Sequence, residues 1–252
     1  MGFHNIIKKV LYQINPTFRM ISNVRTDIEN LTIEIDNIKK ILIKPPKINV
    51  LNGLNLPYEI MMNCKLLPNR DFSLTLLPKG GTMAEVGVAY GEFTRKIFDN
   101  LNPDIFYAID IFSGGPGSDF MERTDWLDSN LGQKDFLKKK FVNEIKNGKF
   151  IIKEGFSWEV LETFDDDYFD YVYLDAAHDY ESVKKDIDVL LKKVKNNGII
   201  QFNDYTYFDL ISRVPYGVIR AVDELLVNNK HEILFFCLNP DGFNDIAVKI
   251  IK

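Results

Sequence analysis

The sequence predicts an α/β protein with a doubly wound sheet of seven strands, mostly parallel with a reversed terminal strand, preceded by an N-terminal helical and coiled-coil segment. From about residue 82, short apolar runs alternate with stretches of helical periodicity, as in parallel sheets covered by helices. Near the end, two apolar runs are separated only by the turn 239–242, so one of them must run antiparallel to the other. Before residue 44, apolar residues recur at heptad spacing.

The N-terminal residues 1–44 are predicted to form helices. Residues 3–14 place apolar side chains on one helical face until Pro16 interrupts the pattern. Beyond the break, apolar residues alternate spacings of three and four, which is a heptad a/d seam made of Ile21, Val24, Ile28, Leu31, Ile35, Ile38 and Leu42. Glu34 falls at g and Lys39 at the following e position. This pattern favours a homo-oligomer over the alternative, an amphipathic helix docked on its own domain.

The remaining chain divides into a connector, residues 45–80, and a core domain, residues 81–252. Pro45 and Pro46 end the helical pattern, and further Pro and Asn residues punctuate the connector. The core domain is expected to contain strands at 82–88, 105–112, 149–154, 169–176, 198–204, 231–238 and 245–252. Helices are expected at 91–101, about 120–147, 157–164, 180–196 and 218–226.

Composition excludes several classes of protein. The chain has 252 residues, of which 46% are hydrophobic and 27% charged, enough for one sizeable core. A net charge of -5 provides no basic surplus for phosphate backbones, so no nucleic-acid partner is expected. Cys64 and Cys237 lie far apart and are expected to be reduced. With no apolar run of about 20 residues and no signal-peptide pattern, we expect no membrane span and a cytoplasmic location.

The turn after the first core strand, AEVGVAYGEFT at residues 84–94, is suited to binding a ligand. Gly87 and Gly91 let the backbone approach a ligand closely, and free amides at the helix start face an anionic group. Their GxxxG spacing differs from the GxGxxG of nicotinamide enzymes. The second strand ends at Asp110, whose carboxylate can accept both hydroxyls of a ribose, although it could instead cap a helix. Together these features predict a nucleoside-containing cofactor.

Five motifs, EVGVAYGEFT, YAIDIF, EGFSWEVL, YVYLDAAHDYESVKKDI and GIIQFNDY, resemble the successive motifs of class I S-adenosylmethionine-dependent methyltransferases. Within that superfamily, LDAAHDYESVKKD followed by NDY is similar to the macrocin-type sugar O-methyltransferases. The resemblance covers residues 82–252. It implies that Glu85, Gly87 and Gly91 surround the methionine portion of S-adenosylmethionine and that Asp110 holds the ribose. It also implies that Ser157 and Trp158 line the adenine, where the alternatives are a helix N-cap and ordinary packing.

The ends of the fourth and fifth core strands carry a second group of polar residues. Asp175, Asn203 and Asp204 offer oxygen ligands suited to Mg²⁺ or Mn²⁺. Alternatively, these side chains cap loops or contact the sulfonium end of the cofactor without a metal. The resemblance supports a metal, although related enzymes usually carry an acid at the position of Asn203.

His178 follows Asp175 by three residues, and the resemblance implies that it is the general base, acting beside Asp175. An imidazole pKa of about 6.5 suits this task, whereas a lone histidine can also be structural. Tyr205, Tyr207 and Arg213 follow the fifth strand and are expected to contact the acceptor, with Arg213 suited to a phosphate.

The sequence therefore predicts an S-adenosylmethionine-dependent O-methyltransferase assisted by a divalent metal. It is expected to act on a sugar hydroxyl of a nucleotide sugar or a saccharide precursor in glycan or capsule-type biosynthesis. One alternative is a catechol-type small-molecule O-methyltransferase. The other is a non-catalytic coiled-coil scaffold with a degenerate methyltransferase domain, against which the joint presence of Glu85, Asp110, Asp175 and His178 speaks.

Overall fold

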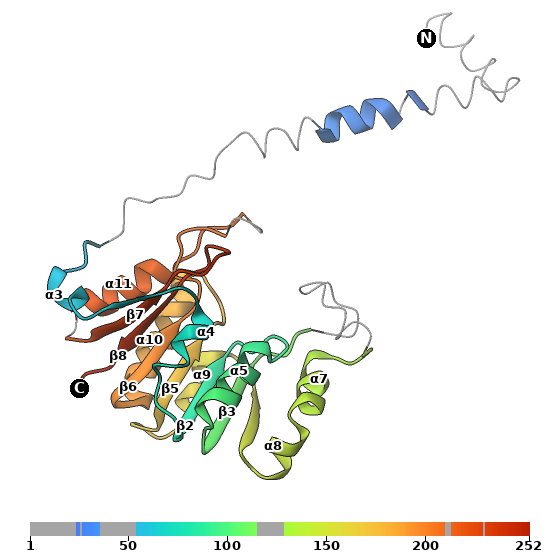
Figure 1. Cartoon of the computed structure of the whole chain (residues 1–252). Coiled ribbons are helices and arrows are strands. Elements are labelled where there is room, and N and C mark those ends of the chain that lie inside the picture. The colour runs from blue at the N-terminus through green and yellow to red at the C-terminus, as the bar shows by residue number, and fades with distance from the viewer. Residues whose placement is uncertain (1–23, 26, 36–53, 115–128, 210–212, 229) are drawn as a thin grey trace, which may run out of the picture. The chain divides into compact units, whose positions relative to one another are not determined.

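The computed structural model describes residues 24–25, 27–35, 54–114, 129–209, 213–228 and 230–252 (Figure 1). The chain divides into two units, Met1–Lys47 and Ile48–Lys252. In the first unit, residues 24–25 and 27–35 are helical and exposed, and Arg25 Nε lies 3.1 Å from Glu29 Oε1. Three of the expected seam residues, Ile21, Ile38 and Leu42, lie outside the described residues, so the coiled coil stays a prediction.

The second unit is built on an eight-stranded sheet in the order β1-β7-β8-β6-β5-β2-β3-β4. The strands are β1 (Lys65–Leu67), β2 (Thr82–Val86), β3 (Ile105–Asp110), β4 (Phe150–Glu154), β5 (Phe169–Leu174), β6 (Val194–Phe202), β7 (Glu232–Cys237) and β8 (Asp245–Lys249). Strand β8 runs antiparallel to both β6 and β7, and all other neighbours are parallel. The expected mostly parallel sheet with a reversed terminal strand is confirmed.

The expected number of seven strands is wrong, because the described residues of the connector supply an eighth. Strand β1 pairs in parallel with β7, placing Leu67 opposite Cys237. It has three residues, of which one is buried, so it carries too little alternation to be detected from periodicity. The same segment forms α3 (Tyr58–Met61) and α4 (Arg70–Ser73). Asn69 caps α4, because its Oδ1 accepts a hydrogen bond from Phe72 N at 2.9 Å.

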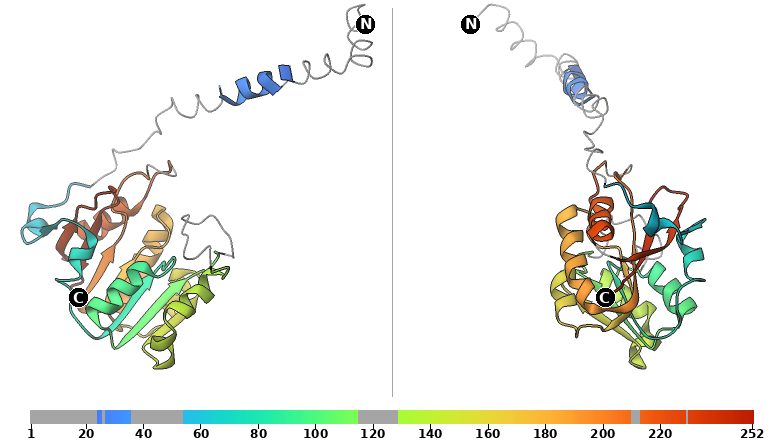
Figure 2. Two further views of the ribbon diagram at one scale, coloured as in Figure 1. Left: turned by 45° about the vertical axis from the view of Figure 1, so that its right-hand side comes forward. Right: turned by 90° about the vertical axis from the view of Figure 1, so that its left-hand side faces the viewer.

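Helices cover both faces of the sheet (Figure 2). On one face, α5 (Glu92–Leu101) and α7 (Gln133–Lys140) contribute to an apolar core, and α8 (Val142–Lys146) follows α7. On the other face, α9 (Ser157–Glu162), α10 (Tyr180–Lys193) and α11 (Val218–Asn228) contribute to a second core. The doubly wound arrangement is therefore confirmed. Of the helix expected at about 120–147, the described part forms α7 and α8.

The period of each helix explains which face it buries. Helix α5 buries Ile97, Phe98 and Leu101, which recur at helical spacing. Helix α10 begins after Asp179, whose Oδ1 accepts a hydrogen bond from Ser182 N at 3.0 Å. Helices α5 and α10 both begin at the carboxyl edge of the sheet, where α/β proteins bind ligands.

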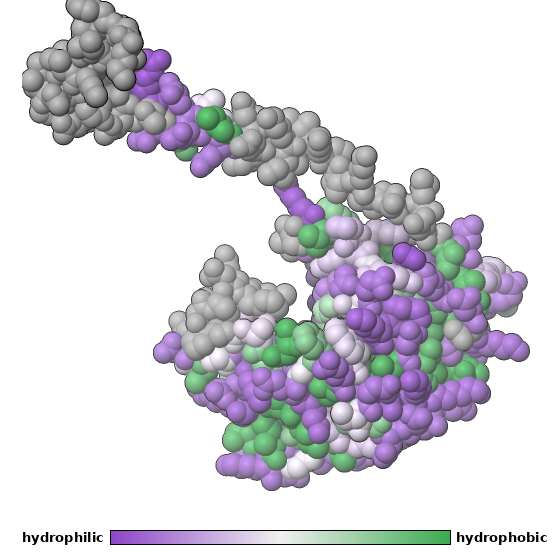
Figure 3. Space-filling model, turned by 180° about the vertical axis from the view of Figure 1, so that it is seen from behind, coloured by the Kyte–Doolittle hydropathy of each residue, from purple (hydrophilic) through white to green (hydrophobic). Residues whose placement is uncertain are grey.

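The side of the molecule opposite to Figure 1 shows mostly hydrophilic residues on the second unit, with smaller hydrophobic patches between them (Figure 3). Among the described helices, none has the length and apolar character needed to cross a membrane.

Candidate active site and cofactor pocket

A pocket of about 680 Å³ lies at the carboxyl ends of β2, β3, β4 and β5. Five of the seven residues expected to contact the cofactor line it, namely Gly87, Asp110, Ser157, Trp158 and Asp175. Glu85 and Gly91 are not among the lining residues. The pocket also contains residues that the sequence did not single out, including Ile111, Gln133, Phe156 and Ser182.

The two glycines of the first turn are required by conformation and by close packing. Gly87 has φ +84°, and a Cβ there would lie 1.9 Å from the carbonyl oxygen of Asp175. Gly91 has φ +68°, and a Cβ there would lie 2.4 Å from Leu137 Cδ1. Gly87 thus lets the ends of β2 and β5 approach each other at the pocket, whereas Gly91 makes room for α7.

Glu85 lies beneath this turn and is 2% exposed. Burial raises the pKa of its carboxyl well above the usual range, and the neighbouring Thr94 hydroxyl acts in the opposite direction. Among the described residues, Oε2 of Glu85 has no hydrogen-bond partner. Its predicted contact with the methionine portion stays a prediction.

Asp110 is held at the pocket wall by three donors. Its Oδ2 accepts hydrogen bonds from Val88 N at 2.9 Å and from Gln133 Nε2 at 3.1 Å. Its Oδ1 accepts a hydrogen bond from Phe112 N at 2.8 Å. A carboxylate offers about four lone-pair positions, so capacity remains for a ribose hydroxyl.

Gln133, at the start of α7, is a pocket residue that the sequence analysis missed. Besides contacting Asp110, its Nε2 donates to Ala89 O at 3.0 Å. Its Oε1 accepts from Gly114 N at 3.2 Å, and its own N donates to Gly114 O at 2.8 Å. One amide side chain therefore links the first turn, Asp110 and the segment after β3. No local sequence pattern marks a glutamine for this role.

The end of the pocket beyond β4 is aromatic. The rings of Phe156 and Trp158 stack at 5.2 Å between centroids with planes 13° apart. Lys185 Nζ lies 4.7 Å from the Trp158 ring centroid, within cation–π range. Helix α9 begins at Ser157, and Phe156 occupies the N-cap without a side-chain capping bond. The Ser157 hydroxyl is therefore not used as an N-cap.

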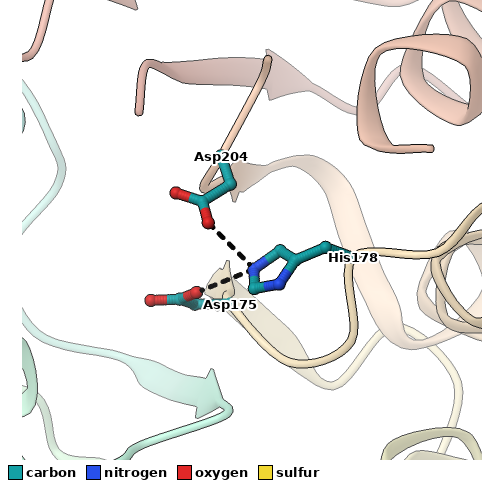
Figure 4. Close-up of side chains that lie close together, drawn as sticks. All are labelled: Asp175, His178 and Asp204. Atoms are coloured by element: carbon teal, nitrogen blue, oxygen red, sulfur yellow. Dashed lines mark hydrogen bonds and ion pairs between the residues drawn. The ribbon is translucent and has the colours of Figure 1, made fainter. Parts of the chain in front are cut away.

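Asp175, His178 and Asp204 converge at the ends of β5 and β6 (Figure 4). His178 Nε2 lies 3.4 Å from Asp175 Oδ1 and 3.2 Å from Asp204 Oδ2. One ligand atom from each of the three residues lies within 4.8 Å of the others, a grouping that could hold a metal ion. We call these three residues the acid–histidine cluster.

Asn203 has a different placement from the other two expected metal ligands. It is 4% exposed, and its Nδ2 donates to Asp204 Oδ1 at 2.8 Å. Its Oδ1 accepts from Arg70 Nη1 at 3.4 Å. The amide oxygen thus faces a guanidinium group, and the amide nitrogen orients Asp204.

Two members of the acid–histidine cluster, Asp204 and His178, hold their protons more tightly than they would in water. Burial and the charge of Asp175 raise the pKa of Asp204 to about 7, while His178 acts in the opposite direction. Burial alone would lower the pKa of His178, but the neighbouring carboxylates of Asp175, Asp204 and Asp209 outweigh burial and raise it.

The three residues expected to contact the acceptor have different surroundings, and their contact with the acceptor stays a prediction. The Tyr205 hydroxyl donates to Asp223 Oδ1 on α11, whereas Tyr207 and Arg213 are exposed. Tyr216, which the sequence analysis missed, stacks on His178 with ring centroids 4.6 Å apart and planes 16° apart. Gly217 N also donates to His178 O at 2.7 Å. The chain around residue 216 therefore fixes the imidazole from one side.

Comparison with known proteins relates this geometry to a family. Residues 84–205 match the family model described as a methyltransferase domain. No curated protein matches the sequence of the chain.

Several solved structures are similar to the chain. The tRNA methyltransferase TrmK of B. subtilis is 13% identical, with 73% of this chain and 66% of that chain covered and a TM-score of 0.50. An rRNA methylase from Streptococcus thermophilus is 10% identical, with coverage of 72% and 93% and a TM-score of 0.47. The O-methyltransferase TomG of Streptomyces achromogenes, solved in complex with SAM, is 13% identical, with coverage of 68% and 73% and a TM-score of 0.48. At these identities the likeness concerns the fold alone.

Proposed function

We propose that the chain is a class I S-adenosylmethionine-dependent methyltransferase and that it methylates a hydroxyl of a sugar, in a nucleotide sugar or saccharide precursor. The match of residues 84–205 to a methyltransferase-domain family model supports the first part of this proposal. The observation that carries this proposal is the acid–histidine cluster, in which Asp175 also lines the pocket. Carboxylates and an imidazole beside a methyl donor suit a reaction in which an acceptor hydroxyl must be bound and lose its proton.

The strand order supports one orientation of the cofactor. Along the carboxyl edge, β4, β3, β2, β5 and β6 follow one another. The aromatic pair Phe156 and Trp158 therefore lies at one end of this row, Asp110 lies next to it, and Asp175 lies toward the other end. The apolar end suits an adenine base, Asp110 suits the ribose and the acidic end suits a positively charged sulfonium. S-adenosylmethionine supplies a methyl group activated by this sulfonium.

His178 is the proposed general base. Its Nε2 faces the carboxylates of Asp175 and Asp204 (Figure 4), and the stacked Tyr216 fixes the plane of the ring. In the proposed reaction, Nε2 takes the proton of the acceptor hydroxyl, the oxygen forms a bond to the methyl carbon, and the carbon–sulfur bond breaks to leave S-adenosylhomocysteine. The carboxylates stabilise the imidazolium that results.

Asp175 and Asp204 are the proposed ligands of Mg²⁺ or Mn²⁺. The two carboxylates fit a cation because their mutual repulsion contributes to the raised pKa of Asp204. Asn203 would join them only if its oxygen left Arg70. A bound divalent cation would lower the pKa of an acceptor hydroxyl. Hydroxyls on adjacent carbons chelate a metal well, which suits a sugar and also a catechol.

Methyl-transfer assays with two acceptor panels test this proposal. We expect transfer from S-adenosylmethionine to nucleotide sugars or saccharides and not to catechols, and a chelator should lower the rate until Mg²⁺ or Mn²⁺ is restored. Asp204→Asn should lose this metal response, whereas Asp241→Asn, in the turn before β8, should keep it. Full turnover in excess chelator would show that the reaction needs no metal. Transfer to catechols alone would show that the acceptor is not a sugar.

A further inference from the structure

Arg70, the first residue of α4, carries a guanidinium that forms no ion pair with a carboxylate of the described residues. Both of its side-chain hydrogen bonds come from Nη1 and go to neutral groups, the Tyr173 hydroxyl at 3.0 Å and Asn203 Oδ1 at 3.4 Å. By contrast, Arg95 and Arg220 each pair with a carboxylate. Arg70 is also partly buried, and a buried charge without a counter-ion is costly. Its position therefore suits an anionic ligand.

The guanidinium of Arg70 keeps hydrogen-bond donors for such a ligand. It has five N–H groups in a planar fork, and the bonds to Tyr173 and Asn203 use Nη1 alone. The N–H groups of Nε and Nη2 have no acceptor in the part of the chain that the structure describes. These two nitrogens lie side by side, which is an arrangement that can bind the two oxygens of a carboxylate.

The neighbours of Arg70 place it beside the predicted site of the methionine portion of the cofactor. Tyr173, which accepts its hydrogen bond, pairs directly with Glu85 across β5 and β2. Phe93, in the first turn of α5, packs on Tyr173 with ring centroids 4.4 Å apart, and its own centroid lies 5.5 Å from the guanidinium carbon of Arg70. Arg70 therefore lies close to the turn 87–91, which joins β2 to α5.

The charges of the cofactor indicate which group this cation would bind. The methionine portion of S-adenosylmethionine carries a positive sulfonium, a positive ammonium and a negative carboxylate. Glu85 is predicted to lie beside this portion, and Asp175 lines the pocket, so acidic side chains are present for the two positive groups. The same acids repel the ligand's carboxylate unless a cation faces it. Arg70 is bonded to Tyr173, which lies opposite Glu85 and two residues before Asp175, and can supply that cation.

We infer that Arg70 binds the carboxylate of the methionine portion through Nε and Nη2, so that the connector supplies part of the cofactor site. The inference rests on the proposed orientation of the cofactor, in which the sulfonium end lies toward Asp175. Arg70 lies outside residues 84–205, which match the family model, and it does not line the 680 Å³ pocket. It therefore extends the cofactor site beyond the part that binds the adenosine.

Two ligands that differ only in this carboxylate test the inference. S-adenosylhomocysteine carries the carboxylate, and decarboxylated S-adenosylhomocysteine has a hydrogen in its place. By titration calorimetry, we expect the wild-type protein to bind S-adenosylhomocysteine at least about tenfold more tightly, the effect of one charged hydrogen-bonded pair. Arg70→Gln should remove this preference, because it weakens binding of S-adenosylhomocysteine and leaves the affinity for the decarboxylated ligand nearly unchanged.

Two further variants complete the test. Lys65→Gln, which removes one positive charge at an exposed position of β1, should keep the wild-type preference. Arg70→Lys keeps the charge without the planar fork and should show a reduced preference, which gives a second answer if Arg70→Gln does not fold. An equal affinity of the wild type for the two ligands would overturn the inference alone, and so would an undiminished preference in the Arg70 variants. Binding of neither ligand by the wild type would overturn the proposed function together with the inference.

Discussion

The environment of His178 favours its protonated form, whereas a general base must be unprotonated when its substrate arrives. Asp175, Asp204 and Asp209 raise its pKa above the ordinary value despite burial. The neutral fraction falls as the pH drops, so we expect turnover to decline on acidification with a midpoint above about 6.5. This limb is measured as kcat against pH.

The variant His178→Gln tests the same residue directly. Loss of a positioned base typically costs about 10² to 10⁴ in rate. His178 is not among the residues lining the cofactor pocket, so affinity for S-adenosylhomocysteine should stay near normal. His4→Gln, the same change in the first unit, is the control. A His178→Gln protein with more than about a tenth of the wild-type turnover would assign the base to another residue.

The Gln133 side chain fixes the orientation of the Asp110 carboxylate. Gln133→Ala removes the donor to Asp110 Oδ2 and the bonds to Ala89 and Gly114. We expect the affinity for S-adenosylhomocysteine to fall about tenfold, since a hydrogen bond to a charged group contributes about 1.5 to 3 kcal/mol. Calorimetry should show less-than-additive losses in Gln133→Ala with Asp110→Ala, because the two act as a unit. Lys139→Ala, on the exposed face of α7, should bind normally, and additive losses would contradict the link.

At the scale of elements, α4 connects the segment before the first core strand to the acid–histidine cluster. Arg70 N donates to Asn239 Oδ1 at 2.8 Å, and Nη1 donates to the Tyr173 hydroxyl at 3.0 Å. Nη1 also reaches Asn203, which orients Asp204. Burial alone would lower the pKa of Arg70, but Tyr173, Asp245 and Asp175 outweigh it. The guanidinium thus stays charged among these acids.

Arg70→Met should therefore destabilise the protein and disturb the cluster. Losing the two side-chain hydrogen bonds of the guanidinium, each about 1.5 to 3 kcal/mol, should lower Tm by on the order of 10 °C. Turnover should fall even at a temperature where the variant is fully folded, because Asn203 loses its bond to Arg70 and no longer holds Asp204 in place. The stability and turnover of Arg70→Lys should lie between those of the wild type and Arg70→Met, since an ammonium keeps the charge but not the planar fork. Lys65→Met, exposed on β1, should behave as wild type. Normal turnover in folded Arg70→Met would show that α4 does not support the acid–histidine cluster.

The long elements were predictable and the short ones were not. The apolar runs of β2, β3 and β5 and the helical period of α10 are strong enough to identify them from sequence. Strand β1 and helix α4, with three and four residues, are too short for a period to develop. The site divides in the same way. Asp110, Asp175 and Asp204 lie at or just after the ends of strands, so topology places them at the carboxyl edge. Gln133, Arg70 and Tyr216 reach it through tertiary contacts that no local pattern records.

The chain divides into two units. In the first unit, apolar side chains are left exposed by the described residues of that unit. Val24, Ile28, Leu31 and Ile35 are each about half exposed, at 48, 57, 55 and 48%. They occupy the a and d positions of the predicted seam. A helix this short is marginal alone in water. Burying a Leu or Ile side chain contributes about 1.5 to 3 kcal/mol, so pairing of seams between copies would stabilise it.

We therefore expect the intact protein to be an oligomer held by this seam. Light scattering at micromolar concentration should show an oligomer for the full chain and a monomer after deletion of residues 1–44. Leu31→Lys should also dissociate it, because a charge at a d position faces the partner helix. Ile33→Lys provides the matched control, since Ile33 is 60% exposed but lies outside the seam. An intact chain that is monomeric would contradict the coiled coil. Equal dissociation by Leu31→Lys and Ile33→Lys would show that association depends on general hydrophobicity and not on the heptad register.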